Sequence, residues 1–120
     1  MDGKIPFILT RELRILANKV RAEMKSLVKT IRAIYGAKIK NLRFKDSCSL
    51  ARYFCIRFTY NGDEYLIAFV LPSLRIIVWK NEDMVFKSSK MVTSDNRIDP
   101  SKAKLAVREV FRYLEENVFI

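Results

Sequence analysis

The chain has 120 residues, which is enough for one hydrophobic core and too few to divide into two domains. Hydrophobic residues make up 50% of it, which excludes an intrinsically disordered protein. The net charge of +10 at pH 7 favours a polyanionic partner, with nucleic acid first and an anionic membrane surface second. We therefore expect one basic globular domain over residues 1–120.

The positive charge is concentrated near the start of the sequence. Residues 1–45 contain 12 Lys and Arg against 3 Asp and Glu, a net charge of +9, whereas residues 46–120 contain 11 against 10. No apolar run approaches the roughly 20 residues that span a bilayer, and no signal-peptide pattern is visible. We expect no transmembrane segment and a cytoplasmic or nucleoid-associated location.

The first predicted element is a helix over residues 11–35. Thr10 is a suitable N-cap, and Gly36 is suited to a left-handed C-cap. Apolar residues recur at steps of three and four and form one stripe that we expect in the core, although the same stripe suits a coiled-coil seam. These residues are Leu13, Leu16, Ala17, Val20, Met24, Leu27, Val28 and Ile31.

An alternating pattern then predicts four strands and a fifth candidate. The Asn61-Gly62 pair is a strong hairpin signal, because a type I′ turn needs positive φ at both positions. If Tyr60 pairs with Asp63, then Phe58, Ile56 and Phe54 face Tyr65, Ile67 and Phe69 on one side of the sheet. A turn at Pro72-Ser73 adds Leu74, Ile76 and Val78 to that side. The predicted strands are 38–45, 52–60, 64–71, 74–80 and, as the fifth, 84–88.

Residues 89–97 are polar and aperiodic and are interpreted as a surface loop. Asp99 as N-cap and Pro100 at the first helical position then begin a last helix with an apolar stripe. The predicted fold is α+β: a long N-terminal helix, an antiparallel meander of four or five strands and a C-terminal helix, with both helices on one sheet face. In outline it resembles small RNA-binding and nucleoid proteins of helix–meander–helix type. The stripe is Ala103, Val107, Val110, Phe111, Leu114 and Val118.

The polar side of the first helix predicts a phosphate-binding surface. Its cations fall within one sector of the helix and repel one another unless an anion neutralises them. Cations of the first strand extend this basic track. The helix residues are Arg11, Arg14, Arg21, Lys25, Lys29 and Arg32, and those of the strand are Lys38, Lys40, Arg43 and Lys45.

The sheet face opposite the core mixes arginine, aromatic and aliphatic residues. Apolar residues on such a face indicate a homodimer interface or cover by another element, whereas arginine beside aromatic rings is typical of a platform on which single-stranded bases stack. The sequence leaves these interpretations open. The residues concerned are Tyr53, Arg57, Leu66, Val70, Arg75, Ile77 and Trp79.

Catalytic machinery is not recognisable in the sequence. The chain has no histidine, which excludes histidine-based acid–base, nucleophilic and metal-hydrolase sites. A carboxylate nuclease is disfavoured as well, because Val78 stands where the second metal-binding carboxylate would be needed. We expect no metal, no cofactor and two reduced thiols at Cys48 and Cys55, with a bridge between them as the alternative.

The leading hypothesis from the sequence is a non-enzymatic nucleic-acid-binding protein. It would contact phosphates through the first helix and first strand, and the sequence does not distinguish DNA from RNA. The second hypothesis is a structural or adaptor subunit of a ribonucleoprotein or viral assembly that binds protein through the second sheet face. A metal-dependent enzyme is third.

Overall fold

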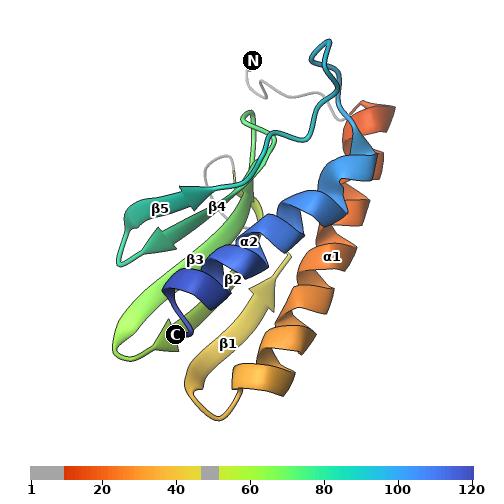
Figure 1. Ribbon diagram of the computed structural model, residues 1–120. Coiled ribbons are helices and arrows are strands. Elements are labelled where there is room, and N and C mark those ends of the chain that lie inside the picture. Colours follow the sequence, from red (N-terminus) through yellow and green to blue (C-terminus); the bar gives the residue numbers. More distant parts are fainter. Residues whose placement is uncertain (1–9, 47–51) are drawn as a thin grey trace, which may run out of the picture.

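The structure is a computed structural model that describes residues 10–46 and 52–120. Its five strands form one antiparallel sheet in the order of the chain, and its two long helices pack on one face of that sheet (Figure 1). This confirms the predicted α+β fold with five strands. The elements are α1 (Arg11–Tyr35), β1 (Ile39–Lys45), β2 (Arg52–Tyr60), β3 (Asp63–Val70), β4 (Arg75–Lys80), β5 (Asp83–Lys87), the 3₁₀ turn η1 (Pro100–Lys102) and α2 (Ala103–Asn117).

Helix α1 has the predicted bounds, but its two ends are stabilised differently from one another. The hydroxyl of Thr10 accepts a hydrogen bond of 3.1 Å from the backbone N–H of Leu13, as expected for an N-cap. The predicted left-handed conformation of Gly36 is wrong, because its φ is −56° and its ψ is −32°. A Cβ at Gly36 would lie 2.3 Å from the carbonyl oxygen of Arg32. Glycine is needed here for close approach to the helix.

The hairpin between β2 and β3 sets the register of the sheet. Asn61 has a φ of 51° and Gly62 a φ of 81°, so both turn residues are left-handed as predicted. Tyr60 pairs with Asp63, and the pairs Phe58 with Tyr65 and Ile56 with Ile67 follow from it. Across the next turn, Ile67 pairs with Val78 and Phe69 with Ile76, which confirms the predicted core side of β4.

Irregularities in β1 and β2 alter the simple alternation, and a third register shift lies between Val78 and Trp79, where β4 pairs with β5. In β1 the register shifts between Lys40 and Arg43, where Asn41 has a φ of 59°. In β2 it shifts between Arg52 and Cys55, next to the predicted pair of Phe54 and Phe69. Such bulges redirect the side chains around them. We call the sheet face that carries the helices the core face, and the opposite one the outer face.

The core lies between the helices and the core face of the sheet. The eight apolar residues predicted for α1 are all buried, and the stripe of α2 joins the same cluster with Phe111 half-buried. After α2, Phe119 turns back and stacks on Tyr35 with ring centroids 4.2 Å apart. The prediction of a wholly surface loop over 89–97 is wrong at Met91, which is fully buried and anchors that loop to the core.

The predicted cap residue Asp99 caps the 3₁₀ turn η1, which leads into α2. The α-helix itself begins at Ala103, three residues after the predicted start at Pro100, and has no side-chain cap of its own. A carboxylate oxygen of Asp99 accepts hydrogen bonds from the backbone N–H of Ser101 at 3.1 Å and from its hydroxyl at 2.6 Å. The hydrogen bond from the Ser101 side chain is the main reason why the pKa of Asp99 lies below its ordinary value of 3.8. The cap therefore contributes its full stability above that ordinary pKa, and the contribution is lost as the pH falls through the lower folded value.

Replacing Asp99 by alanine is expected to lower the melting temperature at pH 7 by a few degrees, because two hydrogen bonds at the helix start are lost. Asp99→Asn is the matched control, since it keeps an oxygen acceptor and should retain most of the stability while losing the pH dependence. Thermal unfolding followed by circular dichroism at pH 7 and at about pH 3 measures both effects. Equal stability of the alanine variant and the wild type would contradict this role of Asp99.

Candidate nucleic-acid interface

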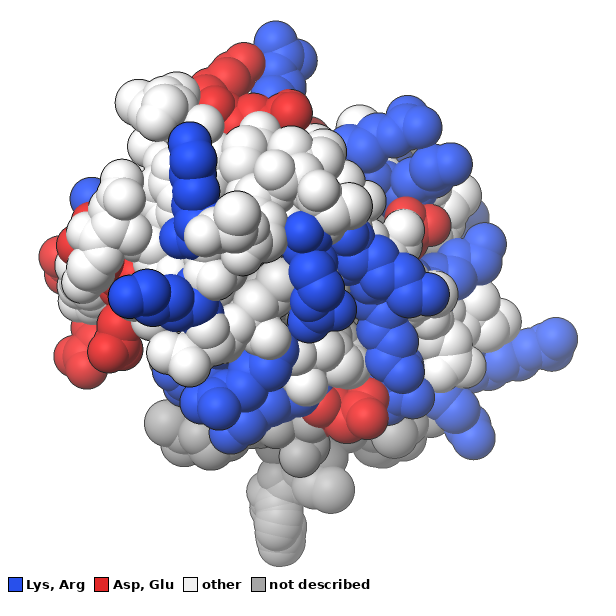
Figure 2. Space-filling view, turned by 90° about the horizontal axis from the view of Figure 1, so that it is seen from below, with Lys and Arg blue, Asp and Glu red and all other residues white. Residues whose placement is uncertain are grey.

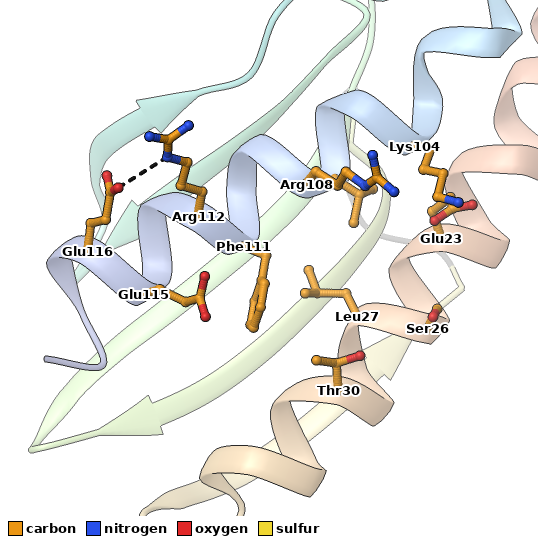
Figure 3. Close-up of a pocket in the computed structure, with 11 residues that line it drawn as sticks. Glu23, Ser26, Leu27, Thr30, Lys104, Arg108, Phe111, Arg112, Glu115 and Glu116 are labelled. Atoms are coloured by element: carbon orange, nitrogen blue, oxygen red, sulfur yellow. Dashed lines mark hydrogen bonds and ion pairs between the residues drawn. The ribbon is translucent and has the colours of Figure 1, made fainter.

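The predicted cations of the first helix form one surface, which we call the α1 stripe: Arg11, Arg14, Arg21, Lys25, Lys29 and Arg32. From Arg11 to Arg32 the helix rises about 32 Å. All of these residues except Arg21 are exposed. The side of α1 that faces α2 carries other residues, among them Glu23 and Leu27 (Figure 3). The stripe therefore lies on the side of α1 away from α2, where β1 runs.

Two members of the stripe contact aromatic rings of the sheet. The guanidinium carbon of Arg21 lies 5.0 Å from the centroid of the Phe54 ring, and Nζ of Lys25 lies 5.5 Å from that of Phe44. Nε of Arg21 is also 3.2 Å from Oδ1 of Asp46, an ion pair without hydrogen-bond geometry. Arg21 is thus only partly exposed, because its cation is held between a carboxylate and an aromatic ring.

The other exposed stripe residues have no such compensation. Among the described residues, no carboxylate lies within 4.0 Å of any of them. Arg21 is the one stripe residue in an ion pair there, and the remaining ion pairs involve Lys80, Arg97 and Arg112. Like charges spaced along one helix side repel one another. The stripe can therefore gain free energy from a neutralising polyanion.

Strand β1 continues the basic surface around the edge of the sheet. Regular alternation would place Lys40 and Arg43 on opposite faces, but the bulge at Asn41 turns both to the outer face, together with Lys45. Lys38 lies in the turn between α1 and β1, where its N–H donates to the carbonyl of Tyr35 at 2.9 Å. All four lysine and arginine side chains are exposed.

The helix stripe and the strand cations meet at the β1 edge of the sheet, with the helix cations on the side of the core face and the strand cations on the outer face. Lys25 lies over Phe44 of β1, which places the two elements in contact. In Figure 2, where α1 lies on the right as in Figure 1, most Lys and Arg side chains gather over the α1 side. The structure thus brings together the two groups of cations that the sequence predicts separately.

The outer face differs in part from its prediction. Tyr53 does not belong to it, because the bulge in β2 turns this ring toward the core, where it stacks on Phe69 with centroids 5.9 Å apart. Arg75 donates a hydrogen bond of 2.8 Å from Nη1 to the carbonyl of Ser88. Arg57 is exposed as expected.

The apolar residues of the outer face are less exposed in the single chain than the predicted homodimer interface would need. Leu66 is 8% exposed and Ile77 is 6% exposed within the single chain. Val70 and Trp79 are half-buried and pack against a small cluster that contains Leu66. A homodimer through this face stays a prediction, but shielding Leu66 and Ile77 does not require one.

A groove lies between the two helices, and the sequence did not predict it. It has a volume of about 500 Å³, and Leu27 and Phe111 contribute apolar surface to it (Figure 3). Lys104, Arg108 and Arg112 follow its α2 side at steps of four residues, a spacing that is visible in the sequence. Carboxylates also line the groove, and Nε of Arg112 donates to Oε2 of Glu116 at 3.1 Å. Its charge is mixed, unlike that of the α1 stripe.

Other kinds of site find little support in the described residues. They contain no group of three or more Cys, Asp or Glu placed to hold a metal ion. Within residues 10–46 and 52–120, none of the helices has the length and apolarity needed to span a membrane. Cys55 is buried and disulfide-bonded, so the expectation of a reduced thiol is wrong there, and Cys48 lies outside the described residues.

Comparison of this chain with protein-family models, with curated proteins and with solved structures gave no significant match. The exposed cations of α1 and β1 are therefore the basis on which a function is proposed.

Proposed function

We propose that the protein binds nucleic acid without catalysing a reaction and that it contacts phosphates through the α1 stripe and β1. The observation that carries this proposal is the row of five exposed stripe cations without an acidic partner among the described residues, next to three further cations on the outer face of β1. Phosphate contacts of this kind release counterions and need no base-specific group.

The arrangement favours a long polyanion over a small anionic ligand. The exposed cations are spread along about 32 Å of helix and along the neighbouring strand. A small anion would neutralise only a few of them, whereas a nucleic-acid backbone offers a phosphate to each in turn. A homodimer would present two such stripes and raise the avidity without new contacts.

The proposed location is cytoplasmic or nucleoid-associated, where nucleic acid is accessible. Disulfides such as that of Cys55 are rare in intracellular proteins other than those of hyperthermophiles, so the disulfide limits this proposed location to such a source. The alternative function, an adaptor subunit that binds protein through the outer face, predicts a complex that is largely insensitive to salt.

Salt dependence tests the proposed function. If five stripe cations and the three β1 cations contact phosphates of duplex DNA, the logarithm of the binding constant should fall with the logarithm of the salt concentration with a slope of about −7. Fluorescence anisotropy of a labelled oligonucleotide at several salt concentrations gives this slope. Absence of binding at low salt, or a slope near zero, would contradict phosphate contacts as the basis of the function.

A further inference from the structure

One row of side chains crosses four strands on the outer face. Arg43 pairs with Arg57, Arg57 with Leu66, and Leu66 with Trp79, each directly opposite the next on neighbouring strands. Directly opposite residues of antiparallel strands project to the same face, with Cβ atoms about 5 Å apart. The row therefore places two guanidinium groups, an aliphatic side chain and an indole side by side.

The two arginines at one end of this row form an unusual pair. Like charges directly opposite in a sheet are destabilising, yet both side chains are exposed, and no carboxylate among the described residues lies within 4.0 Å of either. Asn41, Thr59 and, on the side of β3, Glu64 line the same hollow of about 300 Å³. Two guanidinium forks with amide and hydroxyl donors beside them suit the oxygens of a phosphate group.

The other end of the row borders a second hollow. It has a volume of about 410 Å³, and Leu66 and Trp79 supply its apolar and aromatic surface. Glu64 and Glu82 also line it, and carboxylates accept hydrogen bonds from the amino groups of bases. Arg57 and Glu64 line both hollows, so the two adjoin. The indole of Trp79 can stack on the face of an unpaired base, while the carboxylates beside it accept hydrogen bonds from the base's amino group.

We propose that the outer face binds single-stranded nucleic acid, with a phosphate on Arg43 and Arg57 and a neighbouring base in the hollow beside Trp79. This inference rests on the proposed function and names its ligand. A duplex keeps the faces of its bases stacked inside the helix, so only a single strand or an unpaired end can fill the second hollow. The β1 cations on the same face would guide the strand toward the α1 stripe.

The test uses the fluorescence of Trp79, because it is the only tryptophan in the chain. Titration with a 12-nucleotide oligodeoxycytidylate at low salt is expected to quench this emission through stacking, whereas a duplex of the same length is expected to leave it nearly unchanged. The double variant Arg43→Gln, Arg57→Gln should bind the single strand at least about tenfold more weakly. Lys104→Gln with Arg108→Gln on α2 removes the same charge elsewhere and should change the affinity much less.

A charge-preserving variant separates a phosphate site from general attraction. Arg43→Lys with Arg57→Lys keeps both charges but loses the guanidinium forks, so it should fold like the wild type and still bind the single strand several-fold more weakly. The glutamine variant loses a repulsive like-charge pair, so its thermal stability should not fall. An unchanged melting temperature then shows that its weaker binding is not caused by misfolding.

Two results would overturn this inference. If the single strand binds with a steep salt dependence but the emission of Trp79 does not change, and the Arg43 and Arg57 variants bind like the α2 control, then the proposed function stands and the outer face is not the site. If neither single strand nor duplex binds at low salt, both the inference and the proposed function fail.

Discussion

Replacing Arg14, Lys29 and Arg32 together by glutamate is expected to weaken oligonucleotide binding by on the order of 100-fold at about 50 mM salt, without a loss of thermal stability. All three side chains are exposed on the α1 stripe, and none has an acidic partner among the described residues. Each substitution removes a phosphate contact and adds a repulsive charge at the same place.

The choice of these three residues depends on the tertiary structure. A variant that includes Arg21 and Lys25 would also disturb their contacts with Phe54 and Phe44, and Arg21→Glu would bring a second carboxylate toward Asp46. Such a variant is expected to lose stability, and its weaker binding would be hard to interpret.

The matched control for the α1 stripe is a set of cations away from α1. Lys104 and Arg108 lie on α2 and Lys87 on β5, all three exposed and without an ion pair among the described residues, so their replacement by glutamate makes the same change in net charge. Anisotropy titrations of both variants, with circular dichroism to confirm folding, distinguish the two surfaces. An equal loss of affinity in both variants would show a general charge effect and would contradict a binding surface on α1.

Replacing Ile67 by alanine is expected to lower the free energy of unfolding by about 2–5 kcal/mol. Ile67 is fully buried in the middle of β3, between Ile56 of β2 and Val78 of β4, under the helical layer. Truncation leaves a cavity that the neighbouring strands cannot close without disturbing the register. Urea denaturation, with an unchanged slope of free energy against urea concentration, measures the loss.

Arg57→Ala is the matched control in the sheet, because Arg57 is exposed on the outer face and should cost less than about 0.5 kcal/mol. Arg75 would be a poorer control, since its hydrogen bond to the carbonyl of Ser88 would be lost as well. Similar small losses for Ile67→Ala and Arg57→Ala would show that Ile67 is not on the core side of β3 and would contradict the register.

The elements of the fold follow from signals that act over a few residues. The caps at Thr10 and Asp99 fix where α1 and the η1 turn before α2 begin, since their side chains bond to backbone groups within three positions. The Asn61-Gly62 turn fixes the register of β2 and β3 in the same local way. Periods of 3.6 and 2 then assign the core side of each element. These features could be predicted because neither long-range contacts nor irregular backbone enters into them.

The candidate sites depend on irregularities that periodicity does not reveal. One bulge turns Tyr53 into the core, and the other brings Lys40 to the same face as Arg43. The pairing of Arg43 with Arg57 depends on the register between β1 and β2, which the bulge between Lys40 and Arg43 shifts by one residue.

The sequence alone thus determined the order and approximate bounds of the helices and strands, the core side of their regular parts, and the excess of positive charge on the first helix. Only the tertiary structure decided which cations are free to meet a polyanion, because ion pairs such as Arg21 with Asp46 join segments far apart in the chain. The tertiary structure also decided which face the strand cations occupy. An extra residue in a strand moves every later side chain to the other face of the sheet, and whether a strand takes up such a bulge depends on packing against its neighbours.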